Sequence, residues 1–334
     1  MAIGTSYFGN RIIRHAVDDM ADLAQRGYTG VLHTMSENDL AYYRDTLKEI
    51  VKASHECGLV VQIGPWGLGD VFGGEAESSF VTKHPNACQV LNDGRSVAAG
   101  CLNNGEFRSF VRSWADAAIE AGADSLFWDE PHWAKPKHFN APEERWGCRC
   151  EQCIKRYADR TGEAMPTEAT KEVLEFRQDS MIDFLGHLVA HASSRNVGST
   201  ICLLPLTEGP EGLSNWERVA GLPKLHAIAT DPYWKAFGKP VEPFVGEFAS
   251  KISNLADRFG VQGQIWIQGY GVGPEDEEDI RTAIRTARAA GIEDLWVWGY
   301  EACAHMSYLE TREPHKVWSI VTEELTGSRR SFHG

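Results

Sequence analysis

The chain alternates short apolar runs with longer amphipathic segments along its whole length, and this alternation restricts its fold more than any other feature. The apolar runs are nearly continuous, which is typical of strands buried on both faces of a parallel sheet. We expect strands at residues 2–8, 30–34, 59–66, 125–129, 200–205, 227–234, 264–268 and 295–301. Eight strands, each followed by helix, predict the α/β class and a (β/α)8 TIM barrel.

The amphipathic segments carry helix start and stop signals. Glu37 and Asp39 stand in the first turn of one of them, and Gly58 follows its end. We expect helices at 10–26, 36–57, 105–121, 151–160, 167–194, 241–259, 274–291 and 315–325. A doubly wound open sheet is the alternative, but it requires a glycine-rich turn after the first strand. The segment 9–11, Gly-Asn-Arg, is a poor version of that turn.

Two long excursions interrupt the alternation, after the third and the fourth strand. We expect no regular element between residues 67 and 104, although Trp66, Phe72 and Phe80 argue that this segment is ordered. Its residues 73–75, Gly-Gly-Glu, fit part of a lid and fit a plain surface turn equally well. The second excursion carries a cysteine cluster and two helices. We find no boundary signal, so we expect one domain over residues 1–334.

Composition limits the partners. The net charge of −14 disfavours nucleic acid and anionic membrane surfaces, and suits neutral or cationic small molecules. No apolar run approaches the ~20 residues of a membrane span, and no secretory signal is visible. A cytoplasmic location is therefore expected, and reduced cysteines there favour metal binding over disulfides.

Carboxylates follow several strands, at the barrel end where catalytic residues gather. Asp129 and Glu130 end the fourth strand, Asp231 lies in the sixth and Glu301 in the eighth. Two carboxylates are the minimal apparatus of glycoside hydrolysis. Any single one of them is more often an ordinary loop carboxylate, but the set predicts a catalytic centre.

Aromatic and polar side chains accompany these acids and suit the apolar faces and polar rims of sugars. The candidate substrate contacts are Trp66, His132, Trp133, Tyr233, Trp234, Gln268, Trp298 and Tyr300, with Tyr270 beside them. Three histidines (His33, His132 and His305) also suit the mouth of the barrel, although a lone histidine is more often structural. Residues 269–273 resemble a phosphate loop, but the acidic run after them would repel phosphate.

The strongest local motif is Cys148-x-Cys150-x-x-Cys153. Three thiolates at this spacing hold zinc when a fourth ligand joins them, and a closed four-thiolate shell is structural. Cys101 or Cys88, both in the first excursion, is the candidate fourth ligand. The alternative is three buried free cysteines.

The stretch 84–108 together with this cysteine run resembles the zinc-containing bacterial β-galactosidases of glycoside hydrolase family 42. The resemblance covers residues 84–160. It implies a structural zinc on Cys101, Cys148, Cys150 and Cys153, and an acid/base role for Glu130. The chain departs from the family where Asp129 replaces an asparagine, where Gln268 replaces the glutamate nucleophile, and where the later domains are missing.

Two arrangements restore two-carboxylate chemistry. In the first, Glu130 is the acid/base and Asp231 or Glu301 is the nucleophile or base. In the second, similar to barrel α-glycosidases, Asp129 is the nucleophile and Asp231 the acid/base. We expect a glycosidase acting on a carbohydrate of unknown identity. A sugar isomerase, epimerase or lyase is the alternative enzyme, and a non-catalytic sugar-binding barrel is the third hypothesis. We expect any homo-oligomer to form through the barrel helices.

Overall fold

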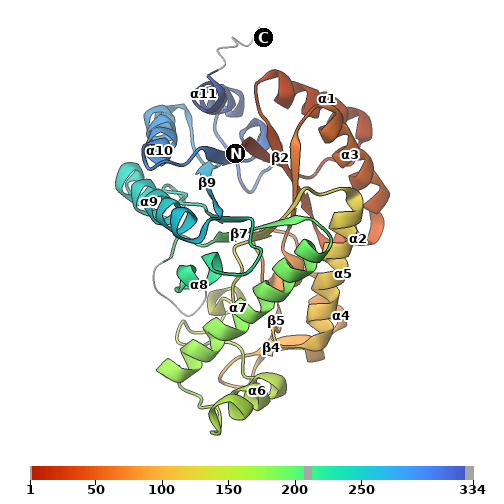
Figure 1. Ribbon diagram of the computed structural model, residues 1–334, viewed down its shortest axis with the longest axis vertical. Helices are drawn as coiled ribbons and strands as arrows, with labels where there is room; N and C mark the ends of the chain where they lie inside the picture. Colours follow the sequence, from red (N-terminus) through yellow and green to blue (C-terminus); the bar gives the residue numbers. More distant parts are fainter. Residues whose placement is uncertain (1, 207–212, 328–334) are drawn as a thin grey trace.

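The computed structural model describes residues 2–206 and 213–327, and its centre is a closed barrel of parallel strands (Figure 1). The first and last strands pair, with Thr5 opposite Val297, so the sheet has no edge. In barrel order the strands are β1 (Ile3–Tyr7), β10 (Asp294–Trp298), β9 (Gln262–Gln268), β8 (Ala227–Thr230), β7 (Gly198–Leu203), β6 (Ser125–Asp129), β3 (Val60–Pro65) and β2 (Gly30–Met35). The predicted (β/α)8 barrel is confirmed.

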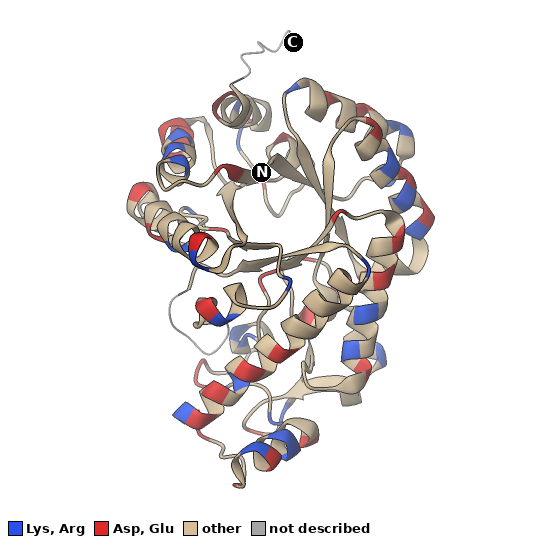
Figure 2. Ribbon diagram, viewed as in Figure 1, with Lys and Arg blue, Asp and Glu red and all other residues tan. Residues whose placement is uncertain are grey.

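Helices surround the barrel and turn their apolar faces inward. In α1 (Ile13–Gln25) the buried residues Ala16, Met20 and Leu23 recur at spacings of four and three, as a helix packed on one side requires. The other long helices are α3 (Arg44–Glu56), α5 (Gly105–Ala121), α7 (Lys171–Ser194), α9 (Val241–Phe259), α10 (Glu277–Ala289) and α11 (Pro314–Thr326). Charged residues colour these outer helices and leave most of the strand ribbon tan (Figure 2).

Large aromatic side chains fill the inside of the barrel. Phe127, Trp266 and Trp296 are almost fully buried there. Two glycines make room for one of these rings, because a Cβ on Gly4 would lie 2.3 Å from the Trp296 ring and one on Gly30 would lie 2.8 Å from it. The interior is thus packed with side chains rather than hollow, as expected for eight strands.

The first excursion contains regular structure, so the expectation of none between 67 and 104 was wrong. It holds η1 (Leu68–Asp70), α4 (Ser79–Lys83), η2 (Pro85–Ala87) and a hairpin of β4 (Cys88–Val90) and β5 (Ser96–Gly100). These elements are three to five residues long, too short to show a sequence period. The expected order is confirmed, since Phe72 and Phe80 are buried.

The second excursion follows β6 and runs through η3 (Pro136–Phe139) and α6 (Glu151–Thr161) into α7. Figure 1 shows α6 and the β4–β5 hairpin together beyond the barrel, at the end of the molecule opposite the C-terminus. The short helix α8 (Trp216–Ala220) precedes β8 and was not predicted. Within the described ranges, no helix combines the length and apolar character needed to cross a bilayer.

Four predicted boundaries differ from those in the structure. Strands β8 and β10 end at Thr230 and Trp298, so Asp231 and Glu301 lie in the loops beyond them, Glu301 within η5 (Tyr300–Cys303). The acidic segment 274–276 forms the separate turn η4 (Pro274–Asp276) before α10. The helix predicted at 36–57 is two helices, α2 (Glu37–Tyr42) and α3, which meet at Tyr43.

Candidate active site

Three carboxyl groups meet where β6 and β8 end. Asp129 is the last residue of β6, Glu130 follows it with a left-handed φ of 38°, and Asp231 directly follows β8. Glu130 lies close enough to Asp231 for its carboxyl group to raise the pKa of Asp231. Asp231 is buried, and its Oδ1 has no hydrogen-bond partner among the described residues. The barrel therefore brings together the three acids that the sequence placed at the ends of strands four and six.

Burial and mutual repulsion control the protonation of this cluster. Burial raises the pKa of Asp129 well above its usual range, and the charges of Glu130 and Glu75 raise it further. Burial likewise raises the pKa of Asp231, and the nearby carboxyl group of Glu130 raises it further. Burial therefore favours the protonated forms of Asp129 and Asp231, and neighbouring carboxyl groups of this kind titrate as a coupled set.

A loop from the first excursion covers the acids. The backbone N–H of Gly73 donates to the carbonyl oxygen of Asp129 at 3.0 Å. A Cβ on Gly73 would lie 2.6 Å from Oδ2 of Asp129 and 3.4 Å from Oε2 of Glu130. Only glycine therefore allows the loop to approach the two carboxylates so closely.

An open pocket of about 640 Å³, which we call the acid pocket, adjoins Glu130. Burial raises the pKa of Asp70, one of its lining residues, to about 6. The pocket is lined by Asp70, Phe72, Gly73, Gly74, Glu75, Glu130, His132, Lys135, His138 and Tyr308. No motif marks Asp70 or Lys135 in the sequence, so neither was predicted; the aromatic content of the first excursion was the one signal in that region.

His132 lines the acid pocket, and its protonation state and tautomer follow from its surroundings. Burial lowers its pKa to about 3, so the ring is neutral at physiological pH. Its Nδ1 lies 2.7 Å from the carbonyl oxygen of Glu130. A carbonyl oxygen only accepts, so Nδ1 carries the proton and Nε2 is left as an acceptor. This bond also braces the left-handed backbone at Glu130.

Gln268 has a structural position, whereas Tyr233 and Tyr270 lie beside Asp231. Gln268 is buried, and its Oε1 accepts from the backbone N–H of Lys235 at 3.1 Å while its Nε2 donates to the Tyr270 carbonyl at 3.0 Å. It therefore holds loops together. Tyr233 packs edge-on against Tyr270, and its pKa is raised by burial and by the charge of Asp231, which places the ring beside the acids.

A second pocket of about 610 Å³, the aromatic pocket, lies over the ends of β1 and β10. Trp66, Tyr300 and Glu301 line it, so Glu301 is separated from the acid pocket that Glu130 lines. The two pockets adjoin where Nε1 of Trp66, in the aromatic pocket, donates to Oε2 of Glu75, in the acid pocket, at 2.8 Å.

The remaining tryptophans line neither pocket. Trp133 is 1% exposed and packs under the guanidinium of Arg177, 5.2 Å from the ring centre, so it belongs to the core of the second excursion. Trp234 is 2% exposed. Trp298 stacks on Phe8 with ring centres 5.6 Å apart and supports the aromatic pocket from behind.

Two further histidines are also placed. His33 is buried and its Nε2 lies 2.8 Å from the Ser54 hydroxyl, with a pKa lowered by burial to about 3, so it is a structural histidine. His305 lines the aromatic pocket, and its Nε2 lies 3.5 Å from Oε2 of Glu301.

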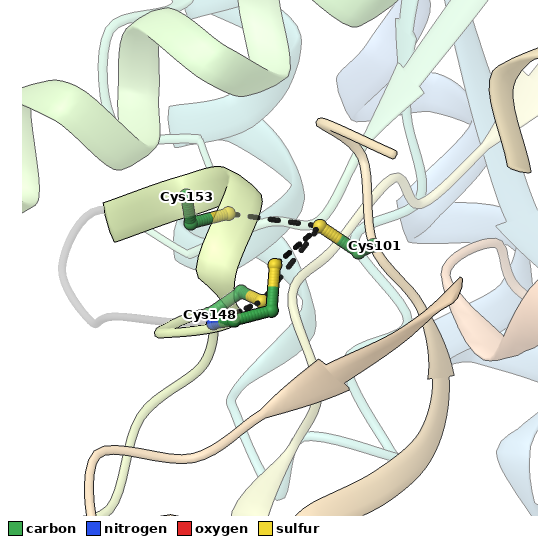
Figure 3. Close-up of side chains that lie close together, drawn as sticks. Cys101, Cys148 and Cys153 are labelled. Carbon is green, nitrogen blue, oxygen red and sulfur yellow. Dashed lines mark hydrogen bonds between the residues drawn. The ribbon is translucent and has the colours of Figure 1, made fainter. Parts of the chain in front are cut away.

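The four predicted cysteines form one cluster that joins the two excursions (Figure 3). The Sγ atom of Cys101 lies 3.5 Å, 3.6 Å and 3.7 Å from those of Cys150, Cys153 and Cys148, respectively. A tetrahedron of sulfurs about 2.3 Å from a central zinc has edges of about 3.8 Å, so the spacing fits this metal. Cys88 stands outside the cluster.

The groups around the cluster also suit bound thiolates. The amide of Asn103 donates to Sγ of Cys153 at 3.3 Å, and the backbone N–H of Cys150 lies 3.4 Å from Sγ of Cys148. Hydrogen bonds among the thiols raise the pKa of Cys101 and lower that of Cys150. Donors of this kind orient metal ligands. Within the described ranges, this is the single group of three or more His, Cys, Asp or Glu side chains close enough to hold a metal ion.

The closed barrel makes the chain a member of the (β/α)8-barrel class. Searches of protein-family models and of curated proteins found no match. The resemblance to glycoside hydrolase family 42 therefore remains a prediction.

Solved structures share the fold at low identity. The endo-1,4-β-mannanase from Rhizomucor miehei matches with a TM-score of 0.66 at 8% identity, over 98% of this chain and 94% of that one. The endo-β-1,4-mannanase from Thermotoga petrophila matches at 0.59 and 8%, over 99% and 78%. A D-allulose 3-epimerase from Methylomonas sp. matches at 0.51 and 10%, over 97% and 95%. The fold is thus shared with hydrolases and with an epimerase.

Proposed function

We propose that the chain is a glycoside hydrolase whose acid/base is Glu130 and whose nucleophile is Asp231. The position of both carboxyl groups at the carboxyl ends of β6 and β8, close enough for Glu130 to raise the pKa of Asp231, carries this proposal. Glu130 also lines the acid pocket, where a leaving group would reach it. Glu301, the other candidate for the second carboxylate, lines the aromatic pocket instead, so we prefer Asp231 for this role.

The proposed reaction has two steps. Protonated Glu130 gives its proton to the glycosidic oxygen while the Asp231 carboxylate attacks the anomeric carbon, forming a glycosyl ester and releasing the aglycone. Glu130, now ionised, takes a proton from water, which attacks the anomeric carbon and frees Asp231. Burial raises the pKa of Asp129 and of Asp231, so the cluster holds protons, and the reaction requires the distribution in which Glu130 carries a proton and Asp231 is ionised.

The closeness of the two carboxyl groups favours retention of configuration. An inverting enzyme needs about 6.5–9.5 Å between its carboxyl groups to admit a water, and a retaining enzyme about 5–5.5 Å. Glu130 lies close enough to Asp231 to raise its pKa, which is nearer to the retaining separation than to the inverting one. We therefore expect the first sugar product to keep the anomeric configuration of the substrate, which NMR of fresh product reports directly.

The test is turnover of a panel of aryl α- and β-glycosides by the wild type, Glu130→Gln and the matched control Glu49→Gln. Glu49 is an exposed glutamate on α3, far along the chain from the acids. We expect activity on one sugar, a fall in kcat of about 10³-fold or more in Glu130→Gln, and no change in the control. Activity that survives in Glu130→Gln would transfer the role to the pair Asp129 and Asp231.

The alternative enzyme is a sugar isomerase, epimerase or lyase. A shared proton among three carboxyl groups also suits proton transfer at a carbon next to a carbonyl. Exchange of substrate protons with deuterated water on free sugars, without any glycoside turnover, would favour this alternative. Saturable sugar binding with neither reaction would favour the non-catalytic barrel.

We also propose that Cys101, Cys148, Cys150 and Cys153 hold one structural zinc ion. The fit of the sulfur spacing to a tetrahedron supports this assignment, and four thiolates leave no open position for water. Zinc there would fasten the hairpin excursion to the loop that carries Glu130. Metal analysis of the purified protein should give about one zinc per chain.

A further inference from the structure

The aromatic pocket has walls suited to a sugar ring. Phe8 lies between Trp66 and Trp298, with ring centres 5.2 Å and 5.6 Å away, and Tyr7 packs on Tyr300 at 5.6 Å. Such rings offer flat faces to C–H groups and attract cations through their π electrons.

Two carboxylates line this pocket, and two histidines, His15 and His305, accompany them. Asp19 and Glu301 line it, whereas no lysine or arginine is among its lining residues. Asp19 accepts hydrogen bonds from the hydroxyls of Tyr7, at 2.6 Å, and Tyr300, at 3.4 Å. Burial raises the pKa of both tyrosines, so they remain neutral donors. With His15 and His305 neutral, Asp19 and Glu301 give the pocket a net negative charge.

One buried group in the pocket lacks a partner. Ser6 lines the pocket and is 0% exposed, and its hydroxyl makes no hydrogen bond to any described residue. A buried hydroxyl without a partner is costly, so a ligand that pairs with it gains affinity. This observation is independent of the acids and points to a polar occupant.

We propose that the aromatic pocket binds a positively charged sugar unit, an amino sugar, of the substrate that the acids cleave. Its ring would lie against Trp66 and Tyr300, its ammonium group beside Glu301, and a hydroxyl near Ser6. The hydrogen bond between Trp66 and Glu75 marks the border with the acid pocket, so one oligosaccharide spans both. The assignment of a shared substrate rests on the proposed hydrolase function.

The neighbours of Glu301 allow this role. Among the described residues its ion-pair partner is His305, whose side chain is 87% exposed, so an ammonium group can replace the imidazole at little cost in free energy. Backbone φ angles of 49°, 53° and 59° at Glu301, Ala302 and Cys303 keep this carboxylate over the pocket. Three consecutive left-handed residues other than glycine are strained, and such strain gathers at functional sites.

The test compares sugars that differ in one substituent. Binding of glucosamine and glucose, and of galactosamine and galactose, is measured by NMR titration at pH 6.5, where the amine is charged. We expect the amino sugars to bind about fivefold tighter or better. Glu301→Gln should abolish this preference, and Glu130→Gln should keep it. If Glu301→Gln does not fold, Asp19→Asn replaces it in the test, and it should weaken the preference for amino sugars.

Three outcomes would overturn the assignment: equal affinity for the amino and neutral sugars, no saturable binding of the amino sugars, or a preference that Glu130→Gln removes and Glu301→Gln retains. The assay breaks no bond, so it is separate from the hydrolase test. A preference for amino sugars without turnover of any glycoside would support the proposed amino-sugar site and contradict the proposed hydrolase function. Turnover of a glycoside without this preference would support the hydrolase function and contradict the amino-sugar site.

Discussion

The buried carboxyl groups of Asp129 and Asp231 make the folded chain sensitive to pH. Burial raises the pKa of each above its usual 3.8, so between about pH 4 and the raised value the folded state binds more protons than the unfolded state. The free energy of unfolding contributed by these groups therefore falls as the pH rises through that window.

Asp231→Asn should consequently stabilise the protein at pH 7.5 while abolishing activity. We expect the melting temperature to rise by roughly 2 °C, corresponding to about 1 kcal/mol, with a smaller rise at pH 4.5. Asp257→Asn, on the exposed side of α9, is the matched control and should change neither value. A variant that is less stable at pH 7.5 than the wild type would contradict the burial argument.

The close approach of Gly73 to the acids gives a test that leaves every acid in place. In Gly73→Ala the new methyl group would meet Oδ2 of Asp129 at 2.6 Å, so the carboxyl group or the loop must move. We expect kcat to fall by about tenfold or more with the fold intact, since small misplacements cost much catalysis. Gly105→Ala, where nothing lies within 4 Å, is the control. Equal kcat values for both variants would mean that the position of the Asp129 carboxyl group does not affect the reaction.

The sequence predicted some of these positions because a strand end fixes where a residue lies. Asp129, Glu130 and Asp231 follow strands whose order and direction the fold class determines, so their meeting was predictable. Trp133 was not placed correctly as a surface platform, because whether a loop aromatic points outward depends on a partner such as Arg177 on α7. Asp70 escaped notice for the same reason, as its loop is shaped by contacts distant in sequence.

Glu37 shows how one element holds another over the site. This buried glutamate, in the first turn of α2, accepts hydrogen bonds from the backbone N–H groups of Gly69 and Phe80 at 3.0 Å and 2.7 Å, and from the hydroxyls of Ser78 and Ser79. It thereby fixes both ends of the loop whose Gly73 covers the acids. The sequence indicated only a helix start at this position.

Glu37→Gln should loosen that loop. In this variant an amide nitrogen, which is itself a donor, would face N–H and O–H donors that now meet a carboxylate oxygen. We expect this to lower the free energy of unfolding of the loop by about 1.5–3 kcal/mol. We expect faster hydrogen exchange at the amides of Gly69 and Phe80 and a lower kcat, while Glu49→Gln on α3 leaves both unchanged. Exchange at wild-type rates in Glu37→Gln would mean that the apolar packing of Phe80 alone holds the loop.

The barrel as a whole was predictable because its signal is repeated. Eight apolar runs separated by amphipathic helices leave few alternatives, and an error in one strand end, as at β8, does not alter the count. The excursions carry no such repetition. Their short hairpin and turns are stabilised by contacts between segments far apart in the chain, among which the cysteine cluster joins residues 101 and 148–153.

That cluster leads to a prediction about the whole molecule. If one zinc ion joins the excursions, then Cys150→Ser should lose it, and the excursions should unfold before the barrel, which retains its own closed sheet and core. We expect calorimetry to show one transition for the wild type and an added transition at lower temperature for Cys150→Ser. Cys57→Ser, remote from the cluster at the end of α3, should retain the metal and the single transition. Loss of the metal from Cys150→Ser with an unchanged melting curve would show that the cluster has no structural role. Two transitions in the wild type would contradict the expectation of a single domain.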